Sequence, residues 1–527
     1  ATYPCMRLTF PLASGYVVWL ISLGSSIFLL RNAKNLLRES RYISAAFFAV
    51  VAITVTWYSL NGNPILIFTK GILPSLRAES LPDPVNDPIG VPKGYNSGRV
   101  VWVHDPAATD WGGAGSGESC WEPQNTDQTV VEKMISIALR GLAGKSNDDE
   151  AWDALFRYTN IQKGVGDRGY QAGEKIVVKV NLTSCNAAWS ADRPNRLRTR
   201  NLDKASDTNP QIILALLRQL VDSANVAQDD IYVGDTVSFF PDQWFNYLAP
   251  VYPLVHYLDH YGYIGRTAVQ KSATPLYWST SDAEGKLQDY LPASFADAHY
   301  IINIPVLKSH AIGGVTACAK NHYGSLMRAP LGHEKGEVKD YYDLHQSLPC
   351  PQVGRGYYRA LVDIMGHRQI GGKTVLYLID ALYAGQDWDG VPFKWNMSPF
   401  NGDWPSSLFA SQDPVAIDSV AYDFLHAEWP NYVETGVCTT NDSLEGGAQD
   451  YLHEAALATN PPSGTFYDPE NDNQAMTSLG VHEHWNNSTE KKYSRNLGTG
   501  NGIELIALKR EIEANAMPWI PLLLIGD

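Results

Sequence analysis

The chain has 527 residues, of which 44% are hydrophobic and 18% are charged, so it can bury a large core and is not a disordered protein. A formal net charge of −15 argues against a nucleic-acid partner, because neutralising phosphates requires a dense positive face. Six scattered cysteines without a C-x-x-C pair exclude a zinc knuckle and predict no iron–sulfur cluster in this chain, while one or two disulfides stay open.

Two long uncharged stretches occupy the N-terminal region, over residues 8–30 and 42–69. Each is long enough to cross a hydrocarbon core of about 30 Å as a helix. The connector between them carries Arg31, Lys34, Arg38 and Arg41 against a single Glu39. The positive-inside rule then places this connector in the cytoplasm and everything after Lys70 outside, in the periplasm or at the cell surface. We therefore expect a two-helix membrane anchor over residues 1–70, with the lipid bilayer as its partner.

Other interpretations of these stretches stay open, namely an uncleaved signal, two buried core helices, or packing elements of an assembly. A Pro- and Gly-rich linker is expected over residues 71–98 and an apolar C-terminal tail over residues 511–527. The tail would need a partner surface to cover it.

Strand and helix signals alternate between the linker and the tail. Short apolar runs predict strands at 100–104, 176–180, 231–233, 300–307, 374–379 and 407–410. Helical periodicity is found at 128–142, at 210–223 with Thr208 as the cap, and from Pro414 with Asp413 as the N-cap. Residues 99–510 are thus expected to form an α/β domain, a mostly parallel sheet flanked by helices and preceded by the transmembrane helical hairpin.

The most informative segment for chemistry is residues 298–328. Lys308, Ser309 and His310 would emerge at the end of the strand 300–307, and Gly313-Gly314 permits a tight turn before a helix at 315–323. A Lys-Ser-His edge facing a helix N-terminus would suit a carboxylate, a phosphate or a metal-bound ligand.

Polar residues also follow the other predicted strands, and open parallel sheets bind ligands at the carboxyl ends of their strands. We therefore expect one shared crevice, although a single Asp after a strand is more often a turn or helix cap. Its predicted catalytic residues are His310, Lys308, Asp235 and Asp380. Its predicted substrate-binding residues are Lys179, Asn181, Lys320 and Asn321, and a divalent metal would be held by His310 and Asp418. For His256, His260, His482 and His484, hydrogen-bonded packing among aromatic residues is the expectation.

The chain resembles the family called domain of unknown function 362 from about Val100 to Leu508. The resemblance is carried by the segments KVNLTS, TNPQIILALLRQLVD, YVGD, NIPVLKSHAIGGVTACAKNHYGS, VLYLIDALYAG, SQDPVAIDSVAYDFL, GVHEHWNN and YSRNLGTGNGIELI. The family lacks a general assigned reaction, and many relatives append a ferredoxin-like cluster domain whose cysteines are absent here.

A weaker similarity to nickel-dependent lactate racemase involves His310, Gly313, Gly314 and Lys320. It implies that His310 is a metal ligand or proton acceptor and that Lys320 holds an anionic group.

Two functional hypotheses follow from the sequence. The first is a membrane-anchored, extracytoplasmic protein whose strand-end active site takes a small anionic substrate, with metal assistance as an option. The alternative is a structural or accessory subunit of a membrane complex or extracellular assembly, without catalysis of its own. Self-association or membrane-complex subunits are the protein partners expected in the second case.

Overall fold

The computed structural model describes residues 83–186, 207–282, 285–310, 312–327, 344–350, 352–387, 390–430 and 447–509. The chain divides into a unit of residues 1–81 and a unit of residues 82–527, and the described residues belong to the second. Within them, no helix combines the length and apolar character needed to span a membrane. The predicted anchor segments 8–30 and 42–69 and the predicted tail 511–527 lie outside the described residues.

A mixed eleven-stranded sheet is the centre of the described unit. Its strands follow the order β15 (Glu504–Lys509), β2 (Arg99–His104), β13 (Ser407–Ser411), β12 (Thr374–Gly385), β9 (Tyr300–Ile304), β3 (Ile176–Val180), β4 (Ile231–Gly234), β5 (His256–Asp259) and β6 (Thr267–Ala268). β10 (Val306–His310) joins it by pairing with β12, and β11 (Gly314–Thr316) pairs with β10. The strands from β12 to β6 are parallel, whereas β13 is antiparallel to both of its neighbours. The α/β class is confirmed, with a sheet of mixed direction.

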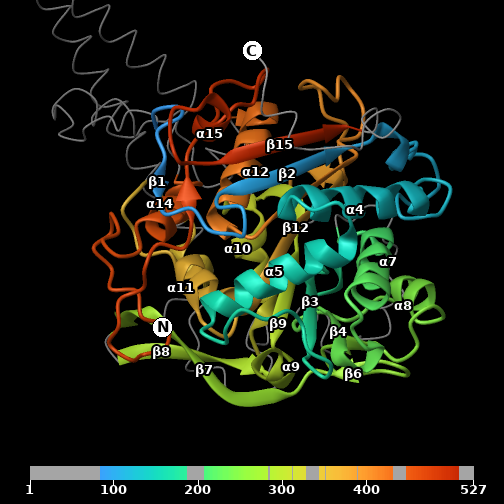
Figure 1. The fold of residues 1–527 in the computed structure, drawn as a ribbon, viewed down its shortest axis with the longest axis horizontal. Coiled ribbons are helices and arrows are strands. Elements are labelled where there is room, and N and C mark those ends of the chain that lie inside the picture. The colour runs from blue at the N-terminus through green and yellow to red at the C-terminus, as the bar shows by residue number, and fades with distance from the viewer. Residues whose placement is uncertain are drawn as a thin grey trace, which may run out of the picture. The chain divides into compact units, whose positions relative to one another are not determined.

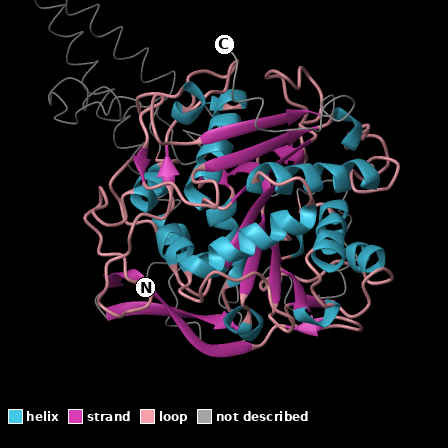
Figure 2. Ribbon diagram, viewed as in Figure 1, coloured by secondary structure: helices cyan, strands magenta, loops and turns pink. Residues whose placement is uncertain are grey.

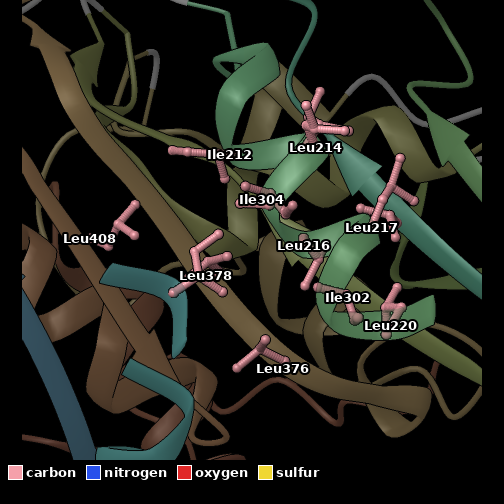
Figure 3. Packing of buried hydrophobic residues seen from close by; sticks show 14 of the residues in the cluster. Ile212, Leu214, Leu216, Leu217, Leu220, Ile302, Ile304, Leu376, Leu378 and Leu408 are labelled. Atoms are coloured by element: carbon pink, nitrogen blue, oxygen red, sulfur yellow. The ribbon is translucent and has the colours of Figure 1, made fainter. Parts of the chain in front are cut away.

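Helices cover both faces of this sheet, because its strands alternate their apolar side chains between two cores. One core lies against α4 (Gln128–Ala143), α5 (Asp148–Gln162) and α7 (Pro210–Arg218), which cross the sheet in Figure 1. The other lies against α10 (Cys318–Asn321), α11 (Ala360–Gly366), α12 (Pro414–Glu428) and α14 (Asp450–Ala456). In Figure 3, Leu216 of α7 packs near Ile302 of β9 and Leu378 of β12.

Smaller elements surround these layers. A two-stranded hairpin, β7 (Lys271–Asp282) with β8 (Gly285–Pro292), runs along the periphery of the molecule in Figure 2. A short pair joins β1 (Ile89–Gly90) to β14 (Val481–His482), so the beginning and the end of the described unit are hydrogen-bonded together. The remaining helices are α8 (Asp242–Leu248), α9 (Ala293–Asp297) and α15 (Ser494–Leu497).

The predicted strands at 100–104, 176–180, 231–233, 374–379 and 407–410 are all present, and β12 is longer than expected. The predicted strand 300–307 is interrupted at Pro305, since proline lacks the N–H that a strand ladder needs. The helix predicted from Val315 is wrong at its start. His310 instead pairs with Gly314, which has a φ of 73°, and Val315 lies in β11.

The helix predicted at 210–223 starts at Pro210, and its cap is Asn209 rather than Thr208. Asp413 is confirmed as the N-cap of α12, because its carboxylate accepts the N–H groups of Val415 and Ala416. The same carboxylate also accepts from Lys93 N at 2.8 Å and Val481 N at 3.2 Å. It therefore ties the linker, α12 and β14 together.

We predict that Asp413→Ala destabilises the protein by about 3 kcal/mol, since it removes a helix cap and leaves several buried N–H groups without an acceptor. Urea unfolding of the purified protein measures this change. The matched control is Asn147→Ala, because Asn147 is an exposed N-cap that accepts from Glu150 N at 2.9 Å. Its expected cost is about 1 kcal/mol. Equal losses for the two variants would contradict the role given to Asp413.

Candidate functional site

The sheet changes its winding direction between β3 and β9, which are adjacent and parallel. From β3 the chain passes through α7 to β4 and continues outward to β5 and β6. From β9 it passes through α10 and α11 on the other face to β12, on the opposite side. Ligand crevices in open α/β sheets form at the carboxyl ends of such a pair of strands. The polar side chains at these ends are therefore the first candidates for a functional site.

Lys179 lies at the centre of this region and is completely buried. Its Nζ donates to Asp235 Oδ2 at 2.9 Å, to Asn321 Oδ1 at 3.0 Å and to the carbonyl oxygen of Val180 at 2.6 Å. An ammonium has three N–H donors, so all of them are in use. Burial lowers the pKa of Lys179, and the charge and hydrogen bond of Asp235 oppose that effect. The geometry makes Lys179 a residue that positions its neighbours.

A chain of side-chain amides connects Lys179 to Lys308. Asn321 Oδ1 also accepts from Asn181 Nδ2 at 3.3 Å, and Asn181 Oδ1 accepts from Lys308 Nζ at 3.1 Å. Asn321 Nδ2 donates in turn to Asn303 Oδ1 at 2.7 Å, and Asn303 lies opposite Lys179 in the β3–β9 pair. Five residues predicted from the sequence, namely Lys179, Asn181, Asp235, Lys308 and Asn321, thus belong to one hydrogen-bonded network.

Asp380 lies beside this network on β12. Its carboxylate accepts the N–H of Asn209 at 2.8 Å, just before α7, and the N–H of Leu382 at 3.0 Å. Burial raises the pKa of Asp380 to about 6, although these N–H groups and the charge of Lys308 act in the opposite direction. Asp380 therefore lies near enough to Lys308 for the positive charge of Lys308 to lower its pKa.

His310 ends β10 and is held as a neutral ring. Its Nδ1 accepts the backbone N–H groups of Ile312 and Gly313, each at 3.1 Å, so in the neutral imidazole the proton lies on Nε2. Burial lowers its pKa well below the usual value, and Lys320, His345 and Lys308 lower it further. The described charged groups that act on His310 are thus all cationic.

Lys320 and Asp418 lie on or against α10. The Lys320 ammonium lies over the Tyr323 ring at 4.6 Å from its centroid. Asp418 accepts the N–H groups of Cys318 at 2.8 Å and Ala319 at 3.0 Å, and the hydroxyl of Tyr451 at 3.0 Å. Because this carboxylate occupies the N-terminus of α10, the free helix N-terminus expected to face the Lys-Ser-His edge is not found there. The metal-ligand role of Asp418 stays a prediction.

A different cluster has the composition of a metal site. Among the described residues, the group of side chains close enough to hold one ion consists of Asp83, His453 and His482, and His484 lies 3.6 Å from the same carboxylate. Burial alone would raise the pKa of Asp83, but the neighbouring imidazoles and Arg355 hold it well below its usual range. Neither His310 nor Asp418 belongs to this group.

Sequence reasoning did not identify this cluster. His482 and His484 were expected only to pack among aromatic residues, and Asp83 and His453 were not considered. The signal that could have found it is the spacing H-x-H in GVHEHWNN, since alternate residues of an extended strand point to the same side.

The comparison with known families agrees with the resemblance noted from the sequence. Residues 193–423 match the family model of a domain of unknown function, DUF362. This match contains Asp235, Lys308, His310, Asp380 and Asp418, whereas Lys179 and Asn181 precede it. No curated protein matches the chain, so the weaker similarity to lactate racemase stays a prediction.

We predict that Lys179→Met destabilises the fold by about 3–5 kcal/mol, because it leaves the buried Asp235 carboxylate without its cation. Chemical denaturation measures the loss. The double variant Lys179→Met with Asp235→Asn removes both charges, and it is expected to be more stable than Lys179→Met alone. If the second substitution makes the protein still less stable, the two side chains do not form the coupled pair described above.

Proposed function

We propose that the strand-end cluster binds a small anion, a carboxylate or a phosphate, and that this binding is the function of the domain. The observation that carries the proposal is the accumulation of positive charge around His310. Lys308, Lys320 and His345 all act on its pKa, and all three are cationic or become so on protonation. Such a cluster, in which Lys308 and His310 are buried and Lys320 and His345 are partly exposed, favours a ligand that brings negative charge.

Lys308 is the proposed principal contact for the anion. Its side chain is 1% exposed, and its partner in the network is a neutral amide oxygen of Asn181. Lys179, by comparison, has the full charge of Asp235 against it. Lys308 would contribute one cation to the anion site, and Lys320 would add a second cation at the rim.

His310 would contribute a hydrogen bond rather than a metal bond. With Nδ1 accepting two backbone N–H groups, the neutral ring presents Nε2–H, which is a donor. A donor suits an anionic oxygen and does not suit a metal ion. We therefore propose an anion site in which His310 is a hydrogen-bond donor and not a metal ligand.

If the domain is an enzyme, Asp380 is the proposed acid–base group. A carboxyl with a pKa of about 6 exchanges protons readily near neutral pH, and Asp380 senses the charge of Lys308. Asp235, bonded to Lys179 and accepting from Val237 N at 3.0 Å, would position the network. A structural subunit without catalysis is the alternative, and it requires neither ligand nor proton transfer.

We further propose that the domain lies outside the cytoplasm, anchored through residues 8–30 and 42–69. The charge-free length of these stretches and the cations between them support this location. Cys350 is disulfide-bonded, which fits an oxidising compartment.

The anion proposal predicts that Lys308→Met weakens the binding of inorganic phosphate or acetate by about 10-fold or more, since a hydrogen bond to a charged group contributes about 1.5–3 kcal/mol. Isothermal titration calorimetry on the purified full chain measures the affinity, and thermal unfolding checks that the variant is folded. Lys308→Arg keeps the charge and should retain part of the affinity.

The matched control is Lys373→Met. Lys373 is half-buried and donates to Ala296 O at 2.8 Å, but it precedes β12 and so lies at the opposite end of the parallel strands. Its substitution should leave both affinities unchanged. A wild-type protein that binds neither anion, or a Lys308→Met variant that binds as well as wild type, would favour the structural subunit.

For the location, we predict that the full chain stays with membranes after alkaline carbonate extraction. Without reductant, we also expect Cys350 to be protected from alkylation, as peptide mass spectrometry would measure. Release of the chain into the soluble fraction would contradict the anchor, and alkylation of Cys350 before reduction would contradict the oxidising location.

A further inference from the structure

We propose that Asp83, His453 and His482 form a binding site for one divalent transition-metal ion of the zinc class, with His484 beside the same carboxylate, and that the ion fastens the start of the domain to its C-terminal part. This site is separate from the anion site and does not depend on it. Three side chains converge here, each imidazole has a hydrogen-bond partner at Nδ1, and the buried Nε2 of His482 has no partner among the described residues.

The backbone brings these residues together from distant parts of the chain. His482 ends β14, and His484 follows two residues later in an extended segment that pairs with Val85. Because alternate residues of an extended chain face the same side, both imidazoles point one way. Glu483 between them points elsewhere and binds Ser494, whose hydroxyl donates to it at 2.9 Å.

α14 supplies His453, and the backbone near residue 83 supplies the carboxylate. Asn86 N donates to His484 O at 2.9 Å, which holds the segment that carries Asp83 beside the two imidazoles. The carboxylate is also oriented from outside by Arg355, which donates to its two oxygens at 2.6 and 2.8 Å. Asp83 is thus placed by contacts on both sides.

The ligand atoms of Asp83, His453 and His482 all lie within 4.8 Å of one another, which is close enough to reach one ion. Asp83 Oδ2 lies 2.8 Å from His453 Nε2, 3.8 Å from His482 Nε2 and 3.6 Å from His484 Nε2. Ligand atoms at about 2.1 Å from a tetrahedral zinc ion are about 3.4 Å apart. The rings are steeply inclined to each other, at 74° for His453 and His482 and 82° for His482 and His484, so they do not stack.

Each imidazole also has a hydrogen-bond partner at Nδ1, on the side of the ring away from Asp83. His453 Nδ1 lies 3.1 Å from the carbonyl oxygen of Gln449, which can only accept. His484 Nδ1 lies 2.6 Å from Asp423 Oδ1, a carboxylate–histidine pair of the kind that supports metal-bound imidazoles. These two contacts place a proton on Nδ1 and direct Nε2 toward Asp83.

The third imidazole has the same arrangement through a hydroxyl. His482 Nδ1 lies 2.8 Å from Ser419 Oγ, and that hydroxyl donates to the carbonyl oxygen of Val415 at 2.7 Å. The hydroxyl must therefore accept from His482, which leaves a lone pair on His482 Nε2. In the part of the chain that the structure describes, this nitrogen is buried and has no hydrogen-bond partner.

The Nε2 atoms of His453 and His482 and one carboxylate oxygen of Asp83 thus converge, and a cation between them offsets their mutual repulsion. A metal ion would also give the buried Nε2 of His482 a partner. Two imidazoles and one carboxylate are a ligand set that zinc accepts, with a further position for a fourth ligand or a water. Since Asp83 lies at the start of the domain and the histidines lie near its end, the ion would join the two.

The test measures zinc on the full chain after the metal has been removed with a chelator. One Zn²⁺ per chain is expected by elemental analysis, and a Co²⁺-loaded sample should show the visible absorption of tetrahedral cobalt. His482→Ala should weaken Zn²⁺ binding by more than about 100-fold, since loss of an outer-shell partner alone costs about 10- to 100-fold. Ser419→Ala, which removes only such a partner, should fall within that smaller range.

The matched control is His367→Ala, because His367 is also buried but bonds Pro275 O at 3.1 Å outside the cluster. It should bind Zn²⁺ as wild type does. If His482→Ala fails to fold, Asp83→Asn replaces it, since this side chain is 20% exposed and keeps its shape. Zn²⁺ should raise the melting temperature of wild type and not of Asp83→Asn. No stoichiometric Zn²⁺ in wild type, or equal affinity in these ligand variants and the control, would overturn the proposal.

Discussion

Burial of the Lys179 ammonium is the constraint on which the centre of this structure depends. A charge without exposure to solvent is tolerated only when each of its donors has an acceptor, and here the acceptors come from β3, from the residue after β4 and from α10. These three elements meet where the sheet changes its winding direction. Lys179 therefore fixes the positions of Asp235 and Asn321, and through the amides it fixes that of Lys308.

The regular parts of the fold could be predicted from the sequence because they follow from periodicity. Strands such as 176–180 are short apolar runs, and α12 begins at a clear Asp-Pro cap. The errors occur where one residue outweighs the local pattern. Pro305 divides an otherwise continuous apolar strand, and the positive φ of Gly314 turns an expected helix start into a hairpin.

The candidate site was partly predictable for a different reason. Residues at the carboxyl ends of adjacent parallel strands meet at one edge of the sheet, so the sequence alone predicts that Lys179, Asn181 and Asp235 lie together. Their separate roles could not be predicted from the sequence, because these roles depend on how many hydrogen-bond donors each partner uses. The histidine cluster was missed because Asp83 and His453 are 370 positions apart in the chain, and no local pattern joins them.

The two clusters differ in the hydrogen-bonding groups that they present, and they therefore favour ligands of opposite charge. Around His310, the described groups are ammonium donors and an imidazole that presents N–H, so negative charge is favoured there. Around Asp83, whose carboxylate is also bound by Arg355, the imidazoles direct Nε2 toward the carboxylate, so a further cation is favoured. A ligand that satisfied one cluster would be repelled by the other. One domain can therefore hold an anion and a metal ion at the same time without either site competing for the other's ligand.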